Sequence, residues 1–491
     1  MIPGISKSPK ATRVRVDASK CTGHGVCIEV APDLFALDRF GFAYVTESAH
    51  ADLAASGDAR ARVREAEARC PDRAIIVERV EVIAPVAIDP TAAVGDPGPR
   101  LLVDGASDLA ELRALDPSAI DPDAVISELD ASGLCGHGGA HFSVAAKWRS
   151  VRGSGAVVVV NGAEREPGTV KDRHLLETRP FAVLLGAAIT ARVVRADRIL
   201  VAIDVEHEDA TNSMQAALAQ AQDVALLAGV AVELRTVPAR YVAGEESALI
   251  ESLEGNAPLP RVRPPFPTIR GYQGAPTVVH NVETLVQIGS IARHGASWFR
   301  EAGTVAEPGS GIFSVGRYGE TATPVERPYG SDLRTLLGDV GLDGDVGAVI
   351  VGGWSGGVLR PDQLDVALTH LELAARGAAL GTKSIQVVPT DRCIVDVAAE
   401  VVAYFGGESA QQCPSCEQGL PWIADQLRAL ERGDATPLDI DEVRAFATSL
   451  PRRGACALPD GAVRFLQSVF TNFSEVVSAH LAAHVHEGDQ S

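Results

Sequence analysis

The eight cysteines of this 491-residue chain are the residues whose types and spacing most clearly indicate chemistry. Cys21, Cys27 and Cys70 form a first set of three, and His24 lies between the first two. Two thiolates in one loop and a third in a distant Cys-Pro pair are an arrangement that holds iron–sulfur clusters. Three thiolates without a fourth favour a 3Fe-4S cluster. A 4Fe-4S cluster with His24 as the fourth ligand and a zinc ion are the alternatives.

Cys413, Cys416 and Cys456 form a second set of three. A C-x2-C pair with one later cysteine is compatible with zinc, with an iron–sulfur cluster or with redox chemistry, and the residues alone leave these open. Cys135 and Cys393 lie outside both sets. We expect both to be buried small hydrophobic residues, because free cysteine is among the most buried residue types. A reactive thiol at Cys135 is the alternative.

A glycine-rich loop opens the segment GLCGHGGAHFSVAAKW at residues 133–148. Gly136 and Gly138 let the backbone approach a phosphate or a flat ring closely, because they lack a Cβ. Lys147 adds a positive charge nearby. The loop is not the GxGxxG dinucleotide pattern, and taken alone a structural turn explains it equally well.

Polar segments follow the loop at several places where a strand is expected to end. Residues 161–173 read NGAEREPGTVKDR, residues 241–247 read YVAGEES, residues 261–267 read RVRPPFP and residues 280–284 read HNVET. Ligands of open α/β sheets bind at the carboxyl ends of the strands, so these segments are candidates for one site. Each segment alone is also compatible with helix capping or a surface charge run.

The elements that must position these residues alternate between strand and helix in the central part of the chain, which indicates βαβ units around a parallel sheet. Glycine-rich residues from about 303 to 370 predict a small α+β module, and the pattern beyond residue 391 is helical. The expected strands are 156–160, 198–204, 231–237, 312–316 and 348–352, and the expected helices are 175–192, 210–228, 395–405, 420–432 and 440–449.

The charge is spread unevenly along the chain. The formal net charge is −20, which argues against binding to nucleic acid or to an anionic membrane surface. Residues 1–85 contain 12 basic and 12 acidic side chains, so the rest of the chain carries the whole excess. Residues 86–105 begin with a proline- and glycine-rich stretch without an apolar period and predict a linker. No run approaches the roughly 18 apolar residues of a spanning helix, and the N-terminus lacks the apolar core of a signal peptide, so we expect a cytoplasmic protein.

Residues 1–85 resemble the small single-cluster ferredoxins of the actinobacterial type. The Cys21-x2-His24-x2-Cys27 loop and the later Cys70-Pro71 pair carry the resemblance. It implies a one-electron carrier of the kind that often serves haem-thiolate monooxygenases.

Residues 110–480 resemble the flavin-carrying, NADH-oxidising subunit of respiratory complex I and the related diaphorases of hydrogenases and formate dehydrogenases. The glycine loop and the four polar segments carry this resemblance. It implies a Rossmann-like FMN/NADH domain over 106–302, a β-grasp (SLBB) domain over 303–372 and a helical iron–sulfur domain over 373–491. With the ferredoxin-like domain over 1–85 and the linker 86–105, the expected fold is a multidomain α/β and α+β one.

The same resemblance implies a role for individual residues. FMN would be surrounded by Gly136, Gly138, Lys147, Asn161, Gly244, Glu245 and Asn281. Phe142 and Phe266 would stack on the adenine of NADH, and Arg263 would face its pyrophosphate. Glu166 and Glu246 would contact the nicotinamide nucleotide and are the catalytic candidates.

The chain departs from the family pattern at a few positions. Ala410 replaces the first cysteine of the C-terminal motif, so Cys413, Cys416 and Cys456 are expected to hold a 3Fe-4S cluster or an incompletely cysteinyl 4Fe-4S cluster. Arg263 replaces a lysine and keeps its charge. Around the flavin, a family glycine is replaced by His141, and other family residues are replaced by Ser150, Ala163 and His280.

Together these features predict an enzyme of the NADH:ferredoxin oxidoreductase type, because a flavin converts the two electrons of a hydride into the single electrons that clusters accept. Electrons would pass from NADH through FMN, the second and then the first cysteine set to an external redox protein, such as a monooxygenase or another oxygenase. One alternative is a diaphorase subunit bound to partner subunits of a larger dehydrogenase or hydrogenase complex. The other is a non-catalytic electron-transfer scaffold with a decayed NADH site.

Overall fold

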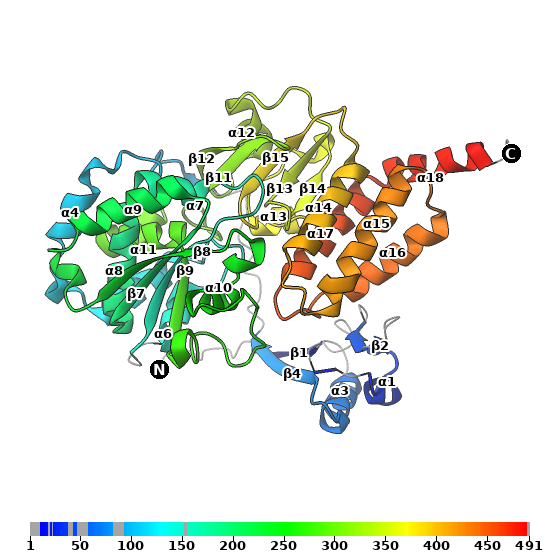
Figure 1. Cartoon of the computed structure of the whole chain (residues 1–491), viewed down its shortest axis with the longest axis horizontal. Helices are drawn as coiled ribbons and strands as arrows, with labels where there is room; N and C mark the ends of the chain where they lie inside the picture. Colours follow the sequence, from blue (N-terminus) through cyan, green and yellow to red (C-terminus); the bar gives the residue numbers. More distant parts are fainter. Residues whose placement is uncertain are drawn as a thin grey trace, which may run out of the picture.

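The computed structural model describes residues 10–17, 20–21, 23–37, 43–46, 57–81, 93–151 and 155–488. In this part of the chain, no helix is long and apolar enough to cross a membrane. Figure 1 shows a small N-terminal domain below a larger body, and the body comprises an α/β domain, a second module with its own sheet and a helical C-terminal part.

The N-terminal domain is built on an antiparallel pair of strands, β1 with β4. Val14, Leu34, Phe35 and Val63 are fully buried and form its core. Cys27 packs into the same core, which places the first cysteine set at its edge. The elements are β1 (Lys10–Val16), α1 (Val26–Val30), β2 (Phe35–Leu37), β3 (Ala43–Val45), α3 (Gly57–Arg69) and β4 (Ile75–Glu81).

The described end of the expected linker, residues 93–105, is tied to the body. Strand β5 (Ala93–Gly95) pairs with β10 (Gly303–Thr304). The Glu326 carboxylate accepts the backbone N–H groups of residues 100–102 at 2.7–3.0 Å. Residues 93–105 therefore belong to the body, and the rest of the expected linker, residues 86–92, lies outside the described residues.

The α/β domain has a four-stranded sheet in the order β8-β7-β6-β9, and all neighbouring strands are parallel. The parallel sheet expected from the alternating pattern is confirmed. The strands are β6 (Val157–Gly162), β7 (Arg198–Asp204), β8 (Ala231–Val237) and β9 (Thr277–Asn281). The α-helices are α4 (Asp108–Ala114), α5 (Pro122–Ser132), α6 (Val144–Val151), α7 (Lys171–Thr178), α8 (Pro180–Val194), α9 (Glu208–Gln220), α10 (Glu246–Leu253) and α11 (Val282–Phe299).

Two close-packed helices cross beside this sheet. Helix α8 is buried almost all round, as its nearly continuous apolar sequence requires. Gly186 lets α8 approach α11, because a Cβ there would collide with the Leu285 backbone. The single helix expected over 175–192 is instead two helices, since Pro180 lacks the N–H that a continuing helix needs and begins α8 as its first residue.

The second module has a mixed five-stranded sheet in the order β12-β11-β15-β13-β14, with β11 and β15 parallel at its centre. The sheet extends beyond residue 372, the end expected for this module, because β15 (Ser384–Val388) lies in its middle. The other elements are β11 (Ser310–Arg317), β12 (Thr323–Pro328), α12 (Leu333–Asp339), β13 (Ala348–Val351), β14 (Gly357–Leu359) and α13 (His370–Ala374).

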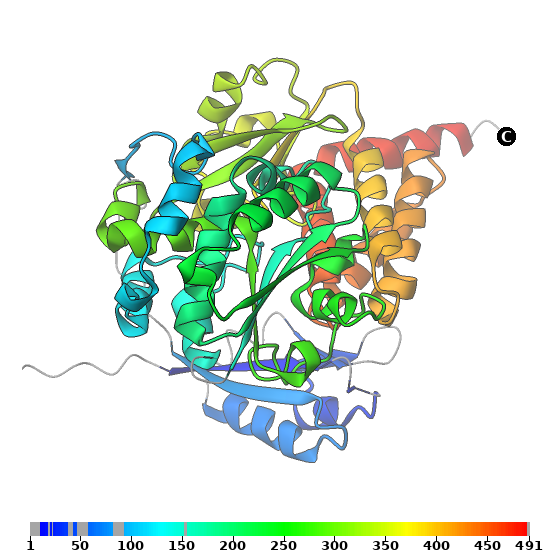
Figure 2. The ribbon, with the colours of Figure 1, turned by 60° about the vertical axis from the view of Figure 1, so that its left-hand side comes forward.

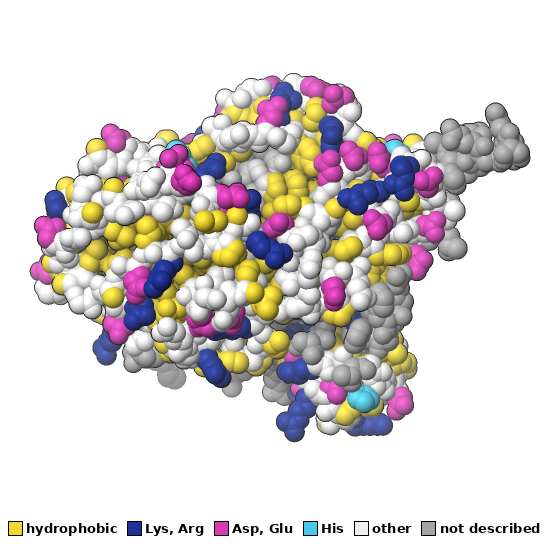
Figure 3. All heavy atoms as spheres, viewed as in Figure 1, with side chains coloured by type: hydrophobic (Ala, Val, Ile, Leu, Met, Phe, Trp, Pro, Cys, Tyr) yellow, Lys and Arg dark blue, Asp and Glu magenta, His cyan; other side chains and the backbone are white. Residues whose placement is uncertain are grey.

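The C-terminal part is a set of packed helices with its own core, which includes Phe405, Leu427, Phe465 and Cys416. The five helices are α14 (Ile394–Glu408), α15 (Leu420–Glu431), α16 (Pro437–Ser449), α17 (Leu458–Asn472) and α18 (Ser474–Gly488). Figures 1 and 2 both place the N-terminal domain beneath the α/β domain and the lower ends of these helices. Acidic and basic side chains are interspersed over the face of the body shown in Figure 3.

Candidate functional site

The glycine loop lies between α5 and α6 and folds back on itself. Gly133 ends α5 in the left-handed conformation (φ 78°), and the Gly136 N–H donates to the Phe142 carbonyl at 2.9 Å. Gly138 faces the start of α11, since a Cβ on it would lie 3.5 Å from the Cβ of Asn281. The loop therefore covers the carboxyl end of β9, where ligands of such sheets bind.

Four charged side chains predicted for the site meet at the ends of the parallel strands. The Lys147 ammonium lies 3.1 Å from the Glu246 carboxylate and donates to the Val279 carbonyl at 3.0 Å. Arg263 pairs with Glu245 and, at 3.2 Å, with Glu246. The structure thus brings together residues that lie up to 116 positions apart in the sequence.

The backbone around this cluster is also closely fitted. The Asn161 amide donates to the Gly244 carbonyl at 2.9 Å. A Cβ on Gly244 would lie only 2.9 Å from the Ala163 carbonyl oxygen, so glycine is required there. Glu245 and Asn281 cap α10 and α11, and each accepts a backbone N–H with its side chain. Helix capping, which the sequence left open, therefore accounts for part of both residues' roles.

Phe142 and Phe266 are exposed, with relative exposures of 57% and 49%. Their rings are accessible to a stacking partner, as the predicted adenine contact requires. Glu166 is placed differently, because its buried carboxylate binds the second module through the Ser355 N–H at 3.0 Å and the Thr382 hydroxyl at 2.5 Å. Burial raises the pKa of Glu166.

A chain of buried charged groups lies next to the loop, and sequence reasoning missed it. Lys171 contacts Asp172 at 2.8 Å and Glu283 at 3.2 Å, and Glu283 contacts Lys383 at 2.9 Å and His137 at 3.1 Å. Asn281 joins the chain by donating to Asp172 at 2.6 Å. The chain was not predictable because Lys383 comes from the second module, and no local pattern indicates that it reaches the glycine loop.

The charged groups of this buried row shift one another's pKa values. Burial would raise the pKa of Glu283, but Lys383, His137 and Lys171 hold it well below its usual range. Burial lowers the pKa of Lys383 to about 8, although Glu283 opposes the shift. Burial, assisted by Lys383, lowers the pKa of His137 to about 4, so this imidazole is neutral near pH 7.

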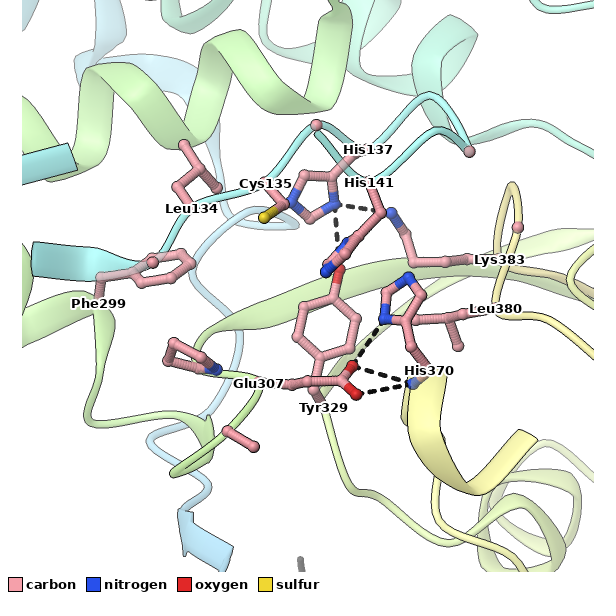
Figure 4. A pocket seen from close by; sticks show the side chains of 16 residues that line it. Leu134, Cys135, His137, His141, Phe299, Glu307, Tyr329, His370, Leu380 and Lys383 are labelled. Carbon is pink, nitrogen blue, oxygen red and sulfur yellow. Dashed lines mark hydrogen bonds and ion pairs between the residues drawn. The ribbon is translucent and has the colours of Figure 1, made fainter. Parts of the chain in front are cut away.

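A cavity of about 110 Å³ lies on the other side of the glycine loop, between the loop and the second module (Figure 4). Cys135, His137 and His141 reach it from the loop. Glu307 and His370 line it from the opposite side. The loop therefore has two faces, one toward the strand ends and one toward this cavity.

The cysteines of the first set lie near one another, since Cys21 and Cys70 both interact electrostatically with Cys27. Cys27 is buried, and this burial raises the pKa of its thiol. The neighbouring Cys21 and, to a smaller extent, Cys70 raise it further. Backbone N–H groups donate to the other two sulfurs, Ala43 to Cys21 and Ala74 to Cys70, both at 3.4 Å. Such bonds stabilise sulfurs that carry charge. The His24 imidazole lies 3.6 Å from the Asp72 carboxylate, and its side chain is 55% exposed.

The second cysteine set also converges. Burial and the neighbouring Cys456 and Cys413 raise the pKa of the Cys416 thiol. Burial raises the pKa of Cys456 to about 11. The Ala455 N–H donates to the Cys413 sulfur at 3.4 Å. Within the described residues, no three His, Cys, Asp or Glu side chains are grouped so that they would hold a single metal ion.

Arg453 connects the two sets, because it lies three residues before Cys456 and interacts electrostatically with Cys21. Burial lowers the pKa of its guanidinium to about 10, and the Cys21 charge opposes that shift. The loop before α17 therefore faces the cluster loop of the N-terminal domain.

The two cysteines outside the sets are not fully buried, which corrects the expectation for both. Cys135 lines the cavity beside the glycine loop. Cys393 lies at the N-terminus of α14, and its sulfur is 3.1 Å from the His480 imidazole. A single cysteine in a sequence does not reveal contacts of this kind, which are a cavity for Cys135 and a histidine side chain for Cys393.

Known proteins resemble the chain over nearly all of these parts. Family models match residues 14–77 as a 4Fe-4S single cluster domain, residues 129–290 as the Nuo51 FMN-binding domain and residues 396–480 as the NADH-ubiquinone oxidoreductase-F iron–sulfur binding region. The three matches fall on the N-terminal domain, the glycine loop with its strand ends, and the helices around the second cysteine set.

Curated relatives and solved structures agree with the family models. An F subunit of the NADH-quinone oxidoreductase of Rhizobium meliloti is 33% identical over 73% of this chain and 89% of its own length. The corresponding F subunit of Mycobacterium tuberculosis is 34% identical over 73% and 85%. A chain of NAD+-reducing [NiFe]-hydrogenase in the H2-reduced state has a TM-score of 0.70 and 25% identity, over 97% of this chain and 85% of that one. The protein therefore belongs to the family of NADH-quinone oxidoreductase F subunits, whose members are oxidoreductases of the NADH dehydrogenase type.

Proposed function

We propose that the chain oxidises NADH with an FMN bound under the glycine loop and passes the electrons singly to its own N-terminal ferredoxin domain and on to an external acceptor. The observation that carries the proposal is the position of Arg453, which lies in the loop of the second cysteine set and interacts with Cys21 of the first. Facing loops of this kind support electron transfer between the two cysteine sets.

The residues at the strand ends fit FMN and a dinucleotide. Gly244 lies close to the Ala163 backbone and Gly138 close to the Asn281 side chain, and neither has a side chain that would fill the cradle. Lys147 and Arg263 supply positive charge for phosphate groups, and the buried Arg263 Nε has no partner in the described part of the chain. When bound, FMN accepts a hydride and gives up its electrons one at a time.

The carboxylates of the site select NADH over NADPH. Glu246 lies 3.1 Å from Lys147 and 3.2 Å from Arg263, and a carboxylate beside the adenine ribose repels a 2′-phosphate. NADH is therefore preferred to NADPH. Glu166, fixed by the second module, orients the nucleotide from the other side. Phe142 and Phe266 offer their exposed rings to the adenine.

Both cysteine sets fit iron–sulfur clusters, and the N–H···S bonds to Cys21, Cys70 and Cys413 would stabilise the charge on such thiolate ligands. A 3Fe-4S cluster is favoured at Cys21, Cys27 and Cys70, because the imidazole of His24 points toward Asp72. At the second set, Ala410 supplies no ligand, so a 3Fe-4S cluster or an incompletely cysteinyl 4Fe-4S cluster is expected.

The experiment compares flavin reduction with electron exit. The purified wild type is assayed for iron, sulfide and FMN, and the flavin absorbance is followed after anaerobic addition of NADH. A Cys21→Ala variant should bleach its flavin normally but lose cytochrome c reduction, whereas a Cys393→Ala control should keep both. Full cytochrome c reduction by Cys21→Ala would contradict the route through the N-terminal domain.

A second candidate is a diaphorase subunit within a larger complex, and the hydrogenase chain that covers 97% of this chain favours it. In that case the N-terminal domain delivers electrons to a partner subunit rather than to a soluble acceptor such as a monooxygenase. Partner subunits that co-purify with the native protein support this candidate, while full turnover with a soluble acceptor by the isolated chain supports the first.

A further inference from the structure

His141 occupies a conformation that costs energy. Its φ is 47°, in the left-handed region that only glycine adopts freely. The family pattern has glycine at this position, so this chain carries a side chain where the backbone conformation favours a residue without one. A strained residue persists only where its surroundings compensate for the strain. The contacts of the His141 ring are the candidates for this compensation.

The imidazole of His141 packs against His370, with ring centroids 3.7 Å apart. His370 is itself held by Glu307, whose carboxylate lies 2.7 Å from the ring nitrogen and accepts the His370 backbone N–H at 2.8 and 3.0 Å. Glu307 is fixed in turn, because its N–H donates to the Thr304 hydroxyl at 2.9 Å. Figure 4 shows His141 reaching from the loop toward His370 and Glu307.

We infer that His141 is a positioning residue: with His370 and Glu307 it forms a latch that fixes the glycine loop against α13 and thereby sets how tightly the loop holds FMN. The inference rests on the proposed function, which places FMN on the other face of the loop.

The latch acts on the part of the loop that has few side chains of its own. Residues 138–140 read Gly-Gly-Ala, so they have little to anchor them by packing. The second module abuts them, since a Cβ on Gly139 would lie 3.9 Å from Gly381. A loop held in its binding conformation loses less entropy when the ligand binds, and this increases affinity.

The latch also has a defined pH range. Burial lowers the pKa of His141 to about 4, and His370 adds to that shift while Glu307 opposes it. His137 and Lys383 are the other charged or titratable groups facing this ring, and both also disfavour a second positive charge. Because the pKa is depressed below that of a free histidine, the ring contact is complete above about pH 6.5 and weakens as the pH falls toward 4.

The test measures FMN affinity, without turnover, in the full-length apoprotein titrated with FMN by flavin fluorescence. His141→Gly removes the ring contact, which destabilises the loop, and also relieves the backbone strain, which stabilises it. The two changes therefore act on the loop in opposite directions. If the latch operates, the dissociation constant of FMN rises about fivefold. His370→Ala should give a similar rise, and the double variant should give no more than one single variant. Thermal unfolding confirms that each variant is folded.

A matched control is His294→Ala, which removes an imidazole packed against Trp298 at 4.8 Å on α11, away from the latch. Its FMN affinity should equal that of the wild type. The wild type should lose FMN affinity from pH 7 to pH 5 more steeply than His141→Gly. Equal or tighter FMN binding by His141→Gly overturns the latch while leaving the proposed function intact, and a wild type that binds no FMN overturns both.

Discussion

Glu283 is the residue on which the buried charges beside the glycine loop depend. Its fully buried carboxylate is shared by Lys171, Lys383 and His137, at 2.9–3.2 Å. Buried cations are tolerated only when paired, so this one carboxylate compensates the charges of Lys171 and Lys383, while the neutral His137 contacts it without adding a charge. At this scale the chemistry of the site depends on Glu283 of the HNVET segment, a residue to which the sequence assigned no individual role.

Glu283→Gln should destabilise the α/β domain and second module by about 3–5 kcal/mol, because it leaves two buried ammonium groups without their shared anion. The urea midpoint of unfolding measures this loss. The wild type should lose the same contribution in acid, since a depressed carboxyl pKa stabilises above about pH 4.3 and the effect disappears as the pH falls through the folded-state value.

The matched control is Asp130→Asn, which removes the ion pair between Asp130 and Arg149. The two charged groups are 2.9 Å apart, and both side chains are about half exposed. Water already screens such a pair, so the urea midpoint should barely move. An equal shift in both variants would show that Glu283 has no special role.

The residues that sequence reasoning placed together all belong to the α/β domain. The family resemblance assigned Lys147, Glu246 and Arg263 to one site, and the rule that polar segments at parallel strand ends meet agreed with it for the segments of Glu246 and Arg263. Glu307, His370 and Lys383 could not be found in this way, because they belong to a separate module and their contact with the loop depends on how two folded units dock. The tertiary arrangement of modules leaves no periodic signal in the sequence.

At the scale of elements, the expected strands overlap observed strands and the expected helices 395–405, 420–432 and 440–449 overlap α14, α15 and α16, whereas the helices of the α/β domain were bounded less well. The runs 198–204 and 231–237 coincide with β7 and β8, because β-branched residues bounded by helices define a strand directly. The helix expected over 210–228 ends at Gln220, since a short 3-10 turn over Ala225–Leu227 and β8 follow. Strand β15 was missed altogether, although it is central to its sheet.

Two glycines of the site should respond differently to alanine. Gly138→Ala adds a Cβ 3.5 Å from Asn281, an ordinary contact, so the protein should fold normally but bind FMN at least tenfold more weakly if the flavin occupies that space. Gly244→Ala puts a Cβ 2.9 Å from a backbone oxygen and should lower both stability and FMN affinity. Thermal unfolding and fluorescence titration separate the two effects.

Gly229→Ala is a useful reference, because its Cβ would meet nothing within 4 Å and its φ of 78° alone disfavours a side chain. It should cost some stability and leave FMN binding unchanged. Normal FMN affinity in Gly138→Ala would mean that the flavin does not approach this part of the loop.

At the scale of the whole molecule, the charge asymmetry leads to the hypothesis that basic residues near the N-terminus (Lys7, Lys10, Arg13, Arg15 and Lys20) dock on the acidic body. The side chains of the first three lie outside the described residues, and Lys20 pairs with Asp17 of its own domain at 2.8 Å. The face of the body in Figure 3 has mixed charges rather than one acidic patch. At the junction, a cation of the body, Arg453, interacts electrostatically with Cys21 of the N-terminal domain.

A positive charge next to a cluster stabilises its reduced form, because reduction adds negative charge there. Arg453→Gln should therefore lower the midpoint potential of the cluster at Cys21, Cys27 and Cys70 and slow its reduction after NADH is added, while flavin bleaching keeps its rate. An EPR-monitored redox titration and rapid-freeze kinetics measure the two effects. Arg452→Gln is the control, since its charge acts on Asp460, and it should change neither quantity. If Arg453→Gln leaves both the potential and the reduction rate at wild-type values, the N-terminal domain takes its electrons at a different surface from the one that faces Cys456.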